Sequence, residues 1–210
     1  MDLMHDHDIS LAVEITGSAL AVVDGSDWEQ PARQLEWTRR RTLDHMADAL
    51  LYYAGHVARR ATARVAPVRS GKPEAAPDDL GGDVTTAAAI LSALLGAAPA
   101  GMRAFHPAGM ADADGFRAMA CDELLVHTFD ITDGWGEGLE PPRELIERVL
   151  NRLFPWAPEG IDPWPALLWC NGRIELPAHP QLDRDWLWHC APLDEWDGSV
   201  ARRHIPPQWT

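Results

Sequence analysis

The feature that most restricts the fold is a helical repeat of apolar residues in the segment after Thr38. Such spacing, three or four positions apart, places the side chains on one face of a helix, and that face has to be buried. Thr38 stands where its hydroxyl can accept a hydrogen bond from a free backbone N–H group. We therefore predict a helix from Thr38 to about Val65. Its apolar positions are Leu43, Met46, Leu50, Ala54, Val57 and Ala61.

Four further segments are predicted to be helical. Residues 66–83 are rich in proline, glycine and aspartate, which predicts a long exposed linker before the third helix. Pro141 and Pro142 can open a helix, because proline is tolerated in a first helical turn. These helices are expected over residues 9–23, from Asp83 or Thr85 through Leu95, from Phe116 to about Thr132, and from Pro141 through Leu153.

The composition changes after Pro155, since seven of the ten tryptophans lie beyond residue 150. Asn171-Gly172 stands between the apolar run 166–170 and the run 173–176, and Asn-Gly between two such runs is typical of a tight hairpin. Residues 185–190 alternate and can add a third strand. We predict a mainly α protein. Residues 1–154 are expected to form a helical bundle, and residues 155–210 a small Trp- and Pro-rich, β-containing extension with a short antiparallel hairpin.

The charge balance argues against several classes of partner. A formal net charge of −14 disfavours nucleic acids and anionic membrane surfaces, which need clustered cations. The longest apolar runs are too short to span a membrane. The acidic first residues lack the basic region of a secretory signal, so a cytoplasmic location is expected. The charge does not exclude a small-molecule substrate, which we expect together with a monomeric or homodimeric state.

The three cysteines are Cys121, Cys170 and Cys190, an odd number spread far apart. This pattern argues against a disulfide framework and against a thiolate zinc site. We expect all three to be small buried hydrophobes.

Three residues are the candidate metal ligands. Glu123 and His127 are four apart on a predicted helix, so both lie on one face and can share a metal ion. His45 lies near the start of the helix that follows Thr38, and metal sites in bundles are built from facing helices. The apolar residues around Glu123 indicate that this helix is buried on more than one side. The alternative is a solvated polar pair or a hydrogen-bonded core histidine.

The stretch from Trp37 to His45 resembles the entry to the second helix of the DinB-like superfamily, where a Trp-Thr pair precedes a helix with a metal-binding histidine. Phe116 to Asp130 resembles that superfamily's fourth helix. The resemblance covers roughly residues 9–153 and is nearest to the mycothiol-dependent maleylpyruvate isomerase type. It implies a four-helix bundle whose metal, usually zinc, is held by His45, Glu123 and His127, and thiol-dependent isomerase or transferase activity.

Five more residues are candidates for the surroundings of the metal. Asp130 can accept a hydrogen bond from a ligand ring, or it can be an exposed helix carboxylate. The remaining four either line a pocket or only pack and face solvent: Tyr52, His56, Arg103 and His106.

Three protein ligands leave a coordination position open, which is the catalytic pattern of zinc sites. We therefore expect a divalent metal, with zinc first among the candidates, and a low-molecular-weight thiol similar to mycothiol. The expected reaction is S-transfer to a small electrophile or its cis–trans isomerisation. The alternatives are a metal-dependent hydrolase and a non-catalytic protein that binds metal or a small ligand. The sequence identifies no catalytic side chain besides the ligands.

Overall fold

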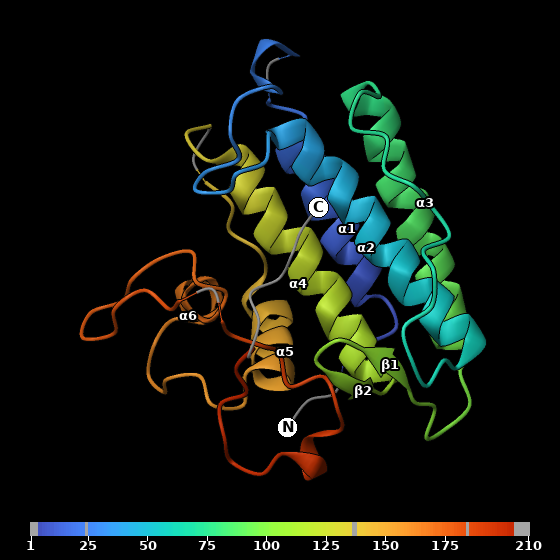
Figure 1. The fold of residues 1–210 in the computed structure, drawn as a ribbon. Helices are drawn as coiled ribbons and strands as arrows, with labels where there is room; N and C mark the ends of the chain where they lie inside the picture. Colours follow the sequence, from blue (N-terminus) through green and yellow to red (C-terminus); the bar gives the residue numbers. More distant parts are fainter. Residues whose placement is uncertain (1–3, 24, 136–137, 184, 204–210) are drawn as a thin grey trace.

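Helices dominate the computed structural model, which describes residues 4–23, 25–135, 138–183 and 185–203 (Figure 1). Four long helices lie side by side: α1 (Asp8–Leu20), α2 (Arg39–Arg59), α3 (Pro77–Gly96) and α4 (Ala113–Thr132). Two shorter ones follow, α5 (Arg143–Leu153) and α6 (Pro163–Cys170). The prediction of a mainly α fold is confirmed. No helix in the described ranges is long and apolar enough to cross a membrane.

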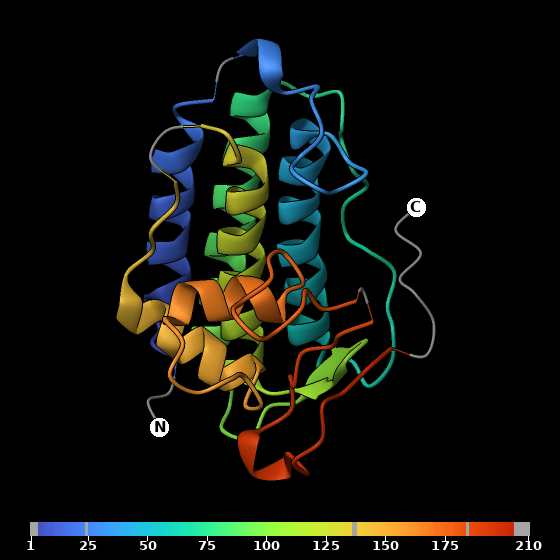
Figure 2. The same ribbon diagram turned by 90° about the vertical axis from the view of Figure 1, so that its left-hand side faces the viewer.

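The four long helices are called the bundle below. In it, α1 and α2 each pack against both α3 and α4 (Figure 2). On its other side α4 contacts α5, which in turn packs against α6. Helix α4 is therefore covered from several directions, which explains why its sequence shows hardly any polar face. The helix that carries two candidate ligands thus lies in the middle of the molecule.

The start of α2 is as predicted, because the Thr38 hydroxyl accepts a hydrogen bond from the Arg41 N–H group at 3.2 Å. Its end is earlier than predicted. Arg60 adopts a left-handed conformation with φ of 44°, so the helix ends at Arg59 rather than near Val65.

The predicted linker 66–83 is shorter than expected, because α3 begins at Pro77 and includes Gly81 and Gly82. Proline suits this position since its φ angle is already helical. The remaining loop is fastened to the bundle rather than free. The Arg69 side chain is 9% exposed, and its guanidinium pairs with Asp44 at 2.6 Å and with Asp83 at 2.9 Å.

The predicted hairpin around Asn171-Gly172 is wrong. Residues 163–170 form helix α6, which Asp162 caps through the Trp164 N–H group, with Pro163 in the first turn. Gly172 takes a left-handed φ of 67°, which ends the helix where a hairpin turn was expected. Glycine serves both structures, so the dipeptide alone does not decide between them.

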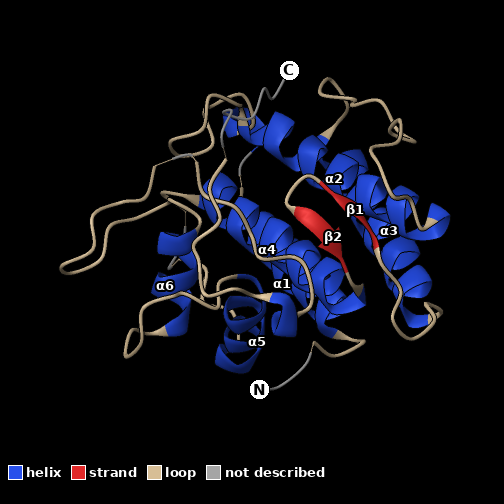
Figure 3. Cartoon of the chain, turned by 60° about the horizontal axis from the view of Figure 1, so that its bottom comes forward, coloured by secondary structure: helices blue, strands red, loops and turns tan. Residues whose placement is uncertain are grey.

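The only paired strands among the described residues lie elsewhere. Strands β1 (Ala104–His106) and β2 (Gly109–Ala111) form an antiparallel pair between α3 and α4, outside every predicted helix and strand (Figure 3). The third strand predicted over residues 185–190 is also absent from the described part of that segment. A single bridge joins Trp186 to Arg202 there. The division of the chain into units at residue 155 stays a prediction.

One of the buried contacts of the C-terminal segment, meaning residues 155–203, lies between α5 and α4. Arg152 on α5 donates to the carbonyl oxygens of His189 at 3.0 Å and Cys190 at 3.1 Å. Opposite it, a Cβ atom added to Gly115 on α4 would lie 2.2 Å from the Cys190 oxygen. Only glycine therefore allows this close approach.

We predict that Gly115→Ala pushes the C-terminal segment away from α4 and lowers the free energy of unfolding by about 1–3 kcal/mol. Urea denaturation measures this loss. The control is Gly82→Ala in α3, where an added Cβ meets nothing within 4 Å. That change should instead stabilise the protein by about 0.5–1 kcal/mol. Equal effects of the two substitutions would contradict the close contact at Cys190.

Candidate metal centre

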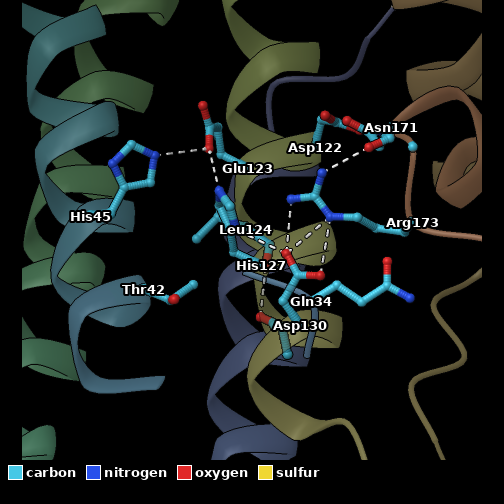
Figure 4. A network of polar contacts seen from close by, with 12 residues as sticks. Gln34, Thr42, His45, Asp122, Glu123, Leu124, His127, Asp130, Asn171 and Arg173 are labelled. Atoms are coloured by element: carbon cyan, nitrogen blue, oxygen red, sulfur yellow. Dashed lines mark hydrogen bonds and ion pairs between the residues drawn. The ribbon is translucent and has the colours of Figure 1, made fainter. Parts of the chain in front are cut away.

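The structure brings the three candidate ligands together between α2 and α4 (Figure 4). One ligand atom from each of His45, Glu123 and His127 lies within 4.8 Å of the others. The Glu123 Oε2 atom is 3.7 Å from His45 Nε2 and 3.2 Å from His127 Nε2. The two imidazole rings meet edge to face, with centroids 5.2 Å apart. Both rings therefore converge on one carboxylate oxygen.

The Glu123 carboxylate is buried and stays ionised. Burial alone would raise its pKa, but hydrogen bonds from His127 and His45 hold that pKa well below its usual range. Its second oxygen accepts a hydrogen bond from the Tyr53 hydroxyl at 2.8 Å. Burial, followed by the nearby Glu123 charge, raises the pKa of Tyr53 well above its usual value, so Tyr53 keeps its proton and donates it. One oxygen of Glu123 is thus fixed and the other faces the histidines.

The two ring nitrogens of His127 have different partners. Nε2 faces Glu123, whereas Nδ1 lies 3.1 Å from the Asp130 carboxylate. Burial lowers the pKa of His127, but Asp130 and Glu123 together raise it to about 9. Asp130 itself is 1% exposed and pairs with Arg173 at 2.8 Å. A histidine held at one nitrogen by a carboxylate, with the other directed at further donors, is the usual surrounding of a metal ligand.

These residues fit a divalent metal. Two imidazole nitrogens and one carboxylate oxygen converge, which is a donor set that zinc and other transition metals take. The carboxylate is buried, and a buried charge needs a compensating charge nearby.

A cavity of about 620 Å³ opens beside the three ligands. Its walls come from the loop before α2, from α4 and from the C-terminal segment. Trp37 covers His45 on one side, with ring centroids 4.9 Å apart. On the opposite side Trp188 donates to Asp122, the neighbour of Glu123, at 3.0 Å. The Arg203 guanidinium also lines the cavity and lies 5.8 Å from the centre of the Trp186 ring.

Asp130 lines this cavity, but the other four predicted pocket residues do not. The His56 ring packs on Tyr52 at 4.1 Å and accepts the Val65 N–H group, so it holds the chain after α2. Arg103 pairs with Glu195 at 2.6 Å. His106 is buried between Tyr53 and Trp188, and burial lowers its pKa to about 3.

The cavity residues of the C-terminal segment, above all Arg173 and Arg203, were not predicted from the sequence. Arg173 directly follows the turn interpreted as a hairpin, and the cap signal Asp162-Pro163 would have identified the helix before it. No local signal marks Arg203. The three cysteines, Cys121, Cys170 and Cys190, are buried as expected.

A second group with suitable donors lies at the start of α1, formed by His5, His7 and Asp8. Its histidines are exposed, and both oxygens of the buried Asp8 already accept hydrogen bonds from Arg148, at 2.6 and 3.0 Å. No residue of this group lines the cavity beside Glu123. The group at Glu123 is therefore the better candidate for a functional metal.

No protein-family model matches the sequence, and no curated protein matches it either. Two solved structures have a similar fold. A mycothiol-dependent maleylpyruvate isomerase superposes with a TM-score of 0.61 at 15% identity, covering 87% of this chain and 100% of its own. A histidine-to-alanine mutant under the same enzyme name gives a TM-score of 0.52 at 17% identity, covering 70% of each chain. The resemblance seen in the sequence is thereby confirmed at the level of the fold.

We predict that His45→Ala, Glu123→Ala and His127→Ala each abolish stoichiometric binding of zinc while helical content is largely retained. The bundle has its own apolar core, so the metal is not needed for folding. Zinc is measured by elemental analysis after dialysis and helicity by circular dichroism. The matched control is His56→Ala, which should lose stability but keep its zinc. Full zinc content in the Glu123 variant would exclude the site.

Proposed function

We propose that this chain is a metal-dependent enzyme that uses a low-molecular-weight thiol for S-transfer, in which the whole thiol is joined to a small electrophile, or for cis–trans isomerisation of that electrophile. The observation that carries the proposal is the meeting of three ligands beside a cavity of about 620 Å³. Structural zinc sites are closed by four ligands, whereas catalytic sites keep a position open. The fold shared with mycothiol-dependent maleylpyruvate isomerases also supports thiol chemistry.

A divalent metal held by His45, Glu123 and His127 would supply the positive charge that lowers the pKa of a thiol. The protein's own contribution is to hold these ligands in place. Tyr53 fixes one oxygen of Glu123, and Asp130 holds His127. Trp37 and Trp188 wall the cavity with apolar surface, which limits the water around the reacting groups.

The cavity suits a small electrophile that carries a carboxylate. Arg203 brings a cation to its wall, and a guanidinium binds a carboxylate through two parallel hydrogen bonds. The volume lies within the usual range of small-ligand sites, about 300–1,000 Å³. In isomerisation, the thiolate adds to one carbon of a C=C bond, rotation follows about the resulting single bond, and elimination expels the thiolate unchanged.

Turnover should need both metal and thiol. Activity should disappear on chelation and return when zinc is added back. The direct test is a titration of cobalt-substituted protein with mycothiol, glutathione, coenzyme A and cysteine, which follows the thiolate-to-cobalt absorption band. A hydrolase would turn over without any thiol. A cobalt spectrum that none of the four thiols perturbs would refute the thiol chemistry.

Arg203 should bind the carboxylate of the electrophile. Arg203→Met should raise KM for a carboxylate-bearing electrophile by about 10- to 100-fold, the value of a hydrogen bond to a charged group. KM for a neutral electrophile should hardly change, and zinc content should stay stoichiometric. The matched control is Arg202→Met, since Arg202 pairs with Asp185 and does not line the cavity beside the ligands. Equal KM changes for both electrophiles would rule out a carboxylate-binding role.

A further inference from the structure

The turn that ends α6, residues 171–173, reaches α4 on both sides of the ligand pair (Figure 4). Asn171 donates to Asp122 at 2.8 Å, one residue before Glu123. Arg173 donates to Asp130 from Nη2 at 2.8 Å and from Nε at 3.1 Å, three residues after His127. A short segment far along the chain therefore contacts the helix next to each of its two ligands.

The contact at Asp130 leads directly to a ligand. The Asp130 carboxylate is 1% exposed, and its two closest partners are the Arg173 guanidinium and His127 Nδ1. Arg173 compensates the buried charge, so Asp130 stays an acceptor for the Nδ1–H group of His127. A metal that replaced the proton on Nε2 would then find the lone pair of this nitrogen on the side of Glu123.

Arg173 is itself held in place from behind. Its Nη1 atom donates to the Asn171 carbonyl oxygen at 2.7 Å, so three of its nitrogens have partners. The backbone between Asn171 and Arg173 turns at Gly172, where an added Cβ atom would lie 3.2 Å from the Leu182 carbonyl oxygen. The guanidinium is thus presented to Asp130 in one orientation, and the rigid shape of this group makes the pair directional.

We propose that Arg173 is a positioning residue of the metal centre. Through Asp130 it fixes which nitrogen of His127 carries the proton and where the ring points. The C-terminal segment then contributes to metal affinity although it supplies no ligand. This inference rests on the metal site of the proposed function.

The test is a double-mutant cycle on zinc affinity, measured by competition with a chelating indicator. Asp130→Asn and Arg173→Met should each weaken zinc binding by about 10- to 100-fold, as is typical for residues that orient a ligand. The variant with both changes should be no weaker than the weaker single variant, because Arg173 acts through Asp130. Losses that multiply in the double variant would overturn the inference, since they would show independent structural effects.

Two further variants separate position from general loosening. Arg103→Met breaks a different ion pair of the C-terminal segment, the one between Arg103 and Glu195. Neither residue lines the cavity beside the candidate ligands, so zinc affinity should stay unchanged. Arg173→Lys keeps the charge without the two-pronged geometry. It should restore part of the affinity and alter the visible spectrum of the cobalt-substituted protein. If Arg173→Met does not fold, Arg173→Lys decides: wild-type affinity with a wild-type spectrum overturns the proposal.

Failure of this inference differs from failure of the metal site. Wild-type protein that binds no zinc, or zinc binding that survives in His127→Ala, would overturn the metal site and the role of Arg173 with it. Zinc binding that needs His127 but is unchanged in Arg173→Met would overturn the role of Arg173 alone.

Discussion

The burial of the ionised Glu123 carboxylate is the constraint on which the rest of the site depends. Burying an unpaired charge in the interior costs roughly several kcal/mol of free energy. Neighbouring elements therefore have to supply hydrogen-bond donors or opposite charges. Here one oxygen faces two imidazoles and the other accepts the Tyr53 hydroxyl. His45 and Tyr53 come from α2 and Glu123 from α4. The arrangement of the candidate ligands therefore depends on how these two helices pack against each other.

Two further carboxylates of α4 need partners, and the C-terminal segment supplies them. Asp122 and Asp130 are both buried, and residues of the C-terminal segment contact both of them. Asn171 and Trp188 supply the hydrogen bonds of Asp122, while Arg173 supplies the ion pair of Asp130. Burial raises the pKa of Asp122 to about 7 despite these hydrogen bonds, whereas Arg173 keeps that of Asp130 below its usual value against the effect of burial. The segment after α5 thus provides partners for buried carboxylates of α4 in addition to covering the bundle.

Features that depend on neighbours in sequence could be predicted. The meeting of His45 with Glu123 and His127 is a distant contact that facing helices and the family resemblance also predicted, whereas the contacts of the C-terminal segment could not be predicted. The Thr38 cap and the shared face of Glu123 and His127 follow from spacing alone. The turn at Asn171-Gly172 shows the limit, because a glycine with positive φ ends a helix as well as it joins two strands. The Asp162-Pro163 cap would have identified only the helix before Arg173, and no local signal marks Arg203, since the importance of both arginines comes from contacts with α4 and with the cavity wall.

The candidate ligands all precede residue 128, whereas much of the cavity wall follows residue 170. This separation along the chain has an evolutionary consequence. A lineage can exchange the residues of the wall, and with them the shape of the cavity, while the candidate donor set on α2 and α4 is inherited unchanged. Arg173 is the exception, since it belongs to the wall and contacts the candidate ligand His127 through Asp130. Descendants that diversify in this segment should therefore either retain that arginine or change Asp130 together with it.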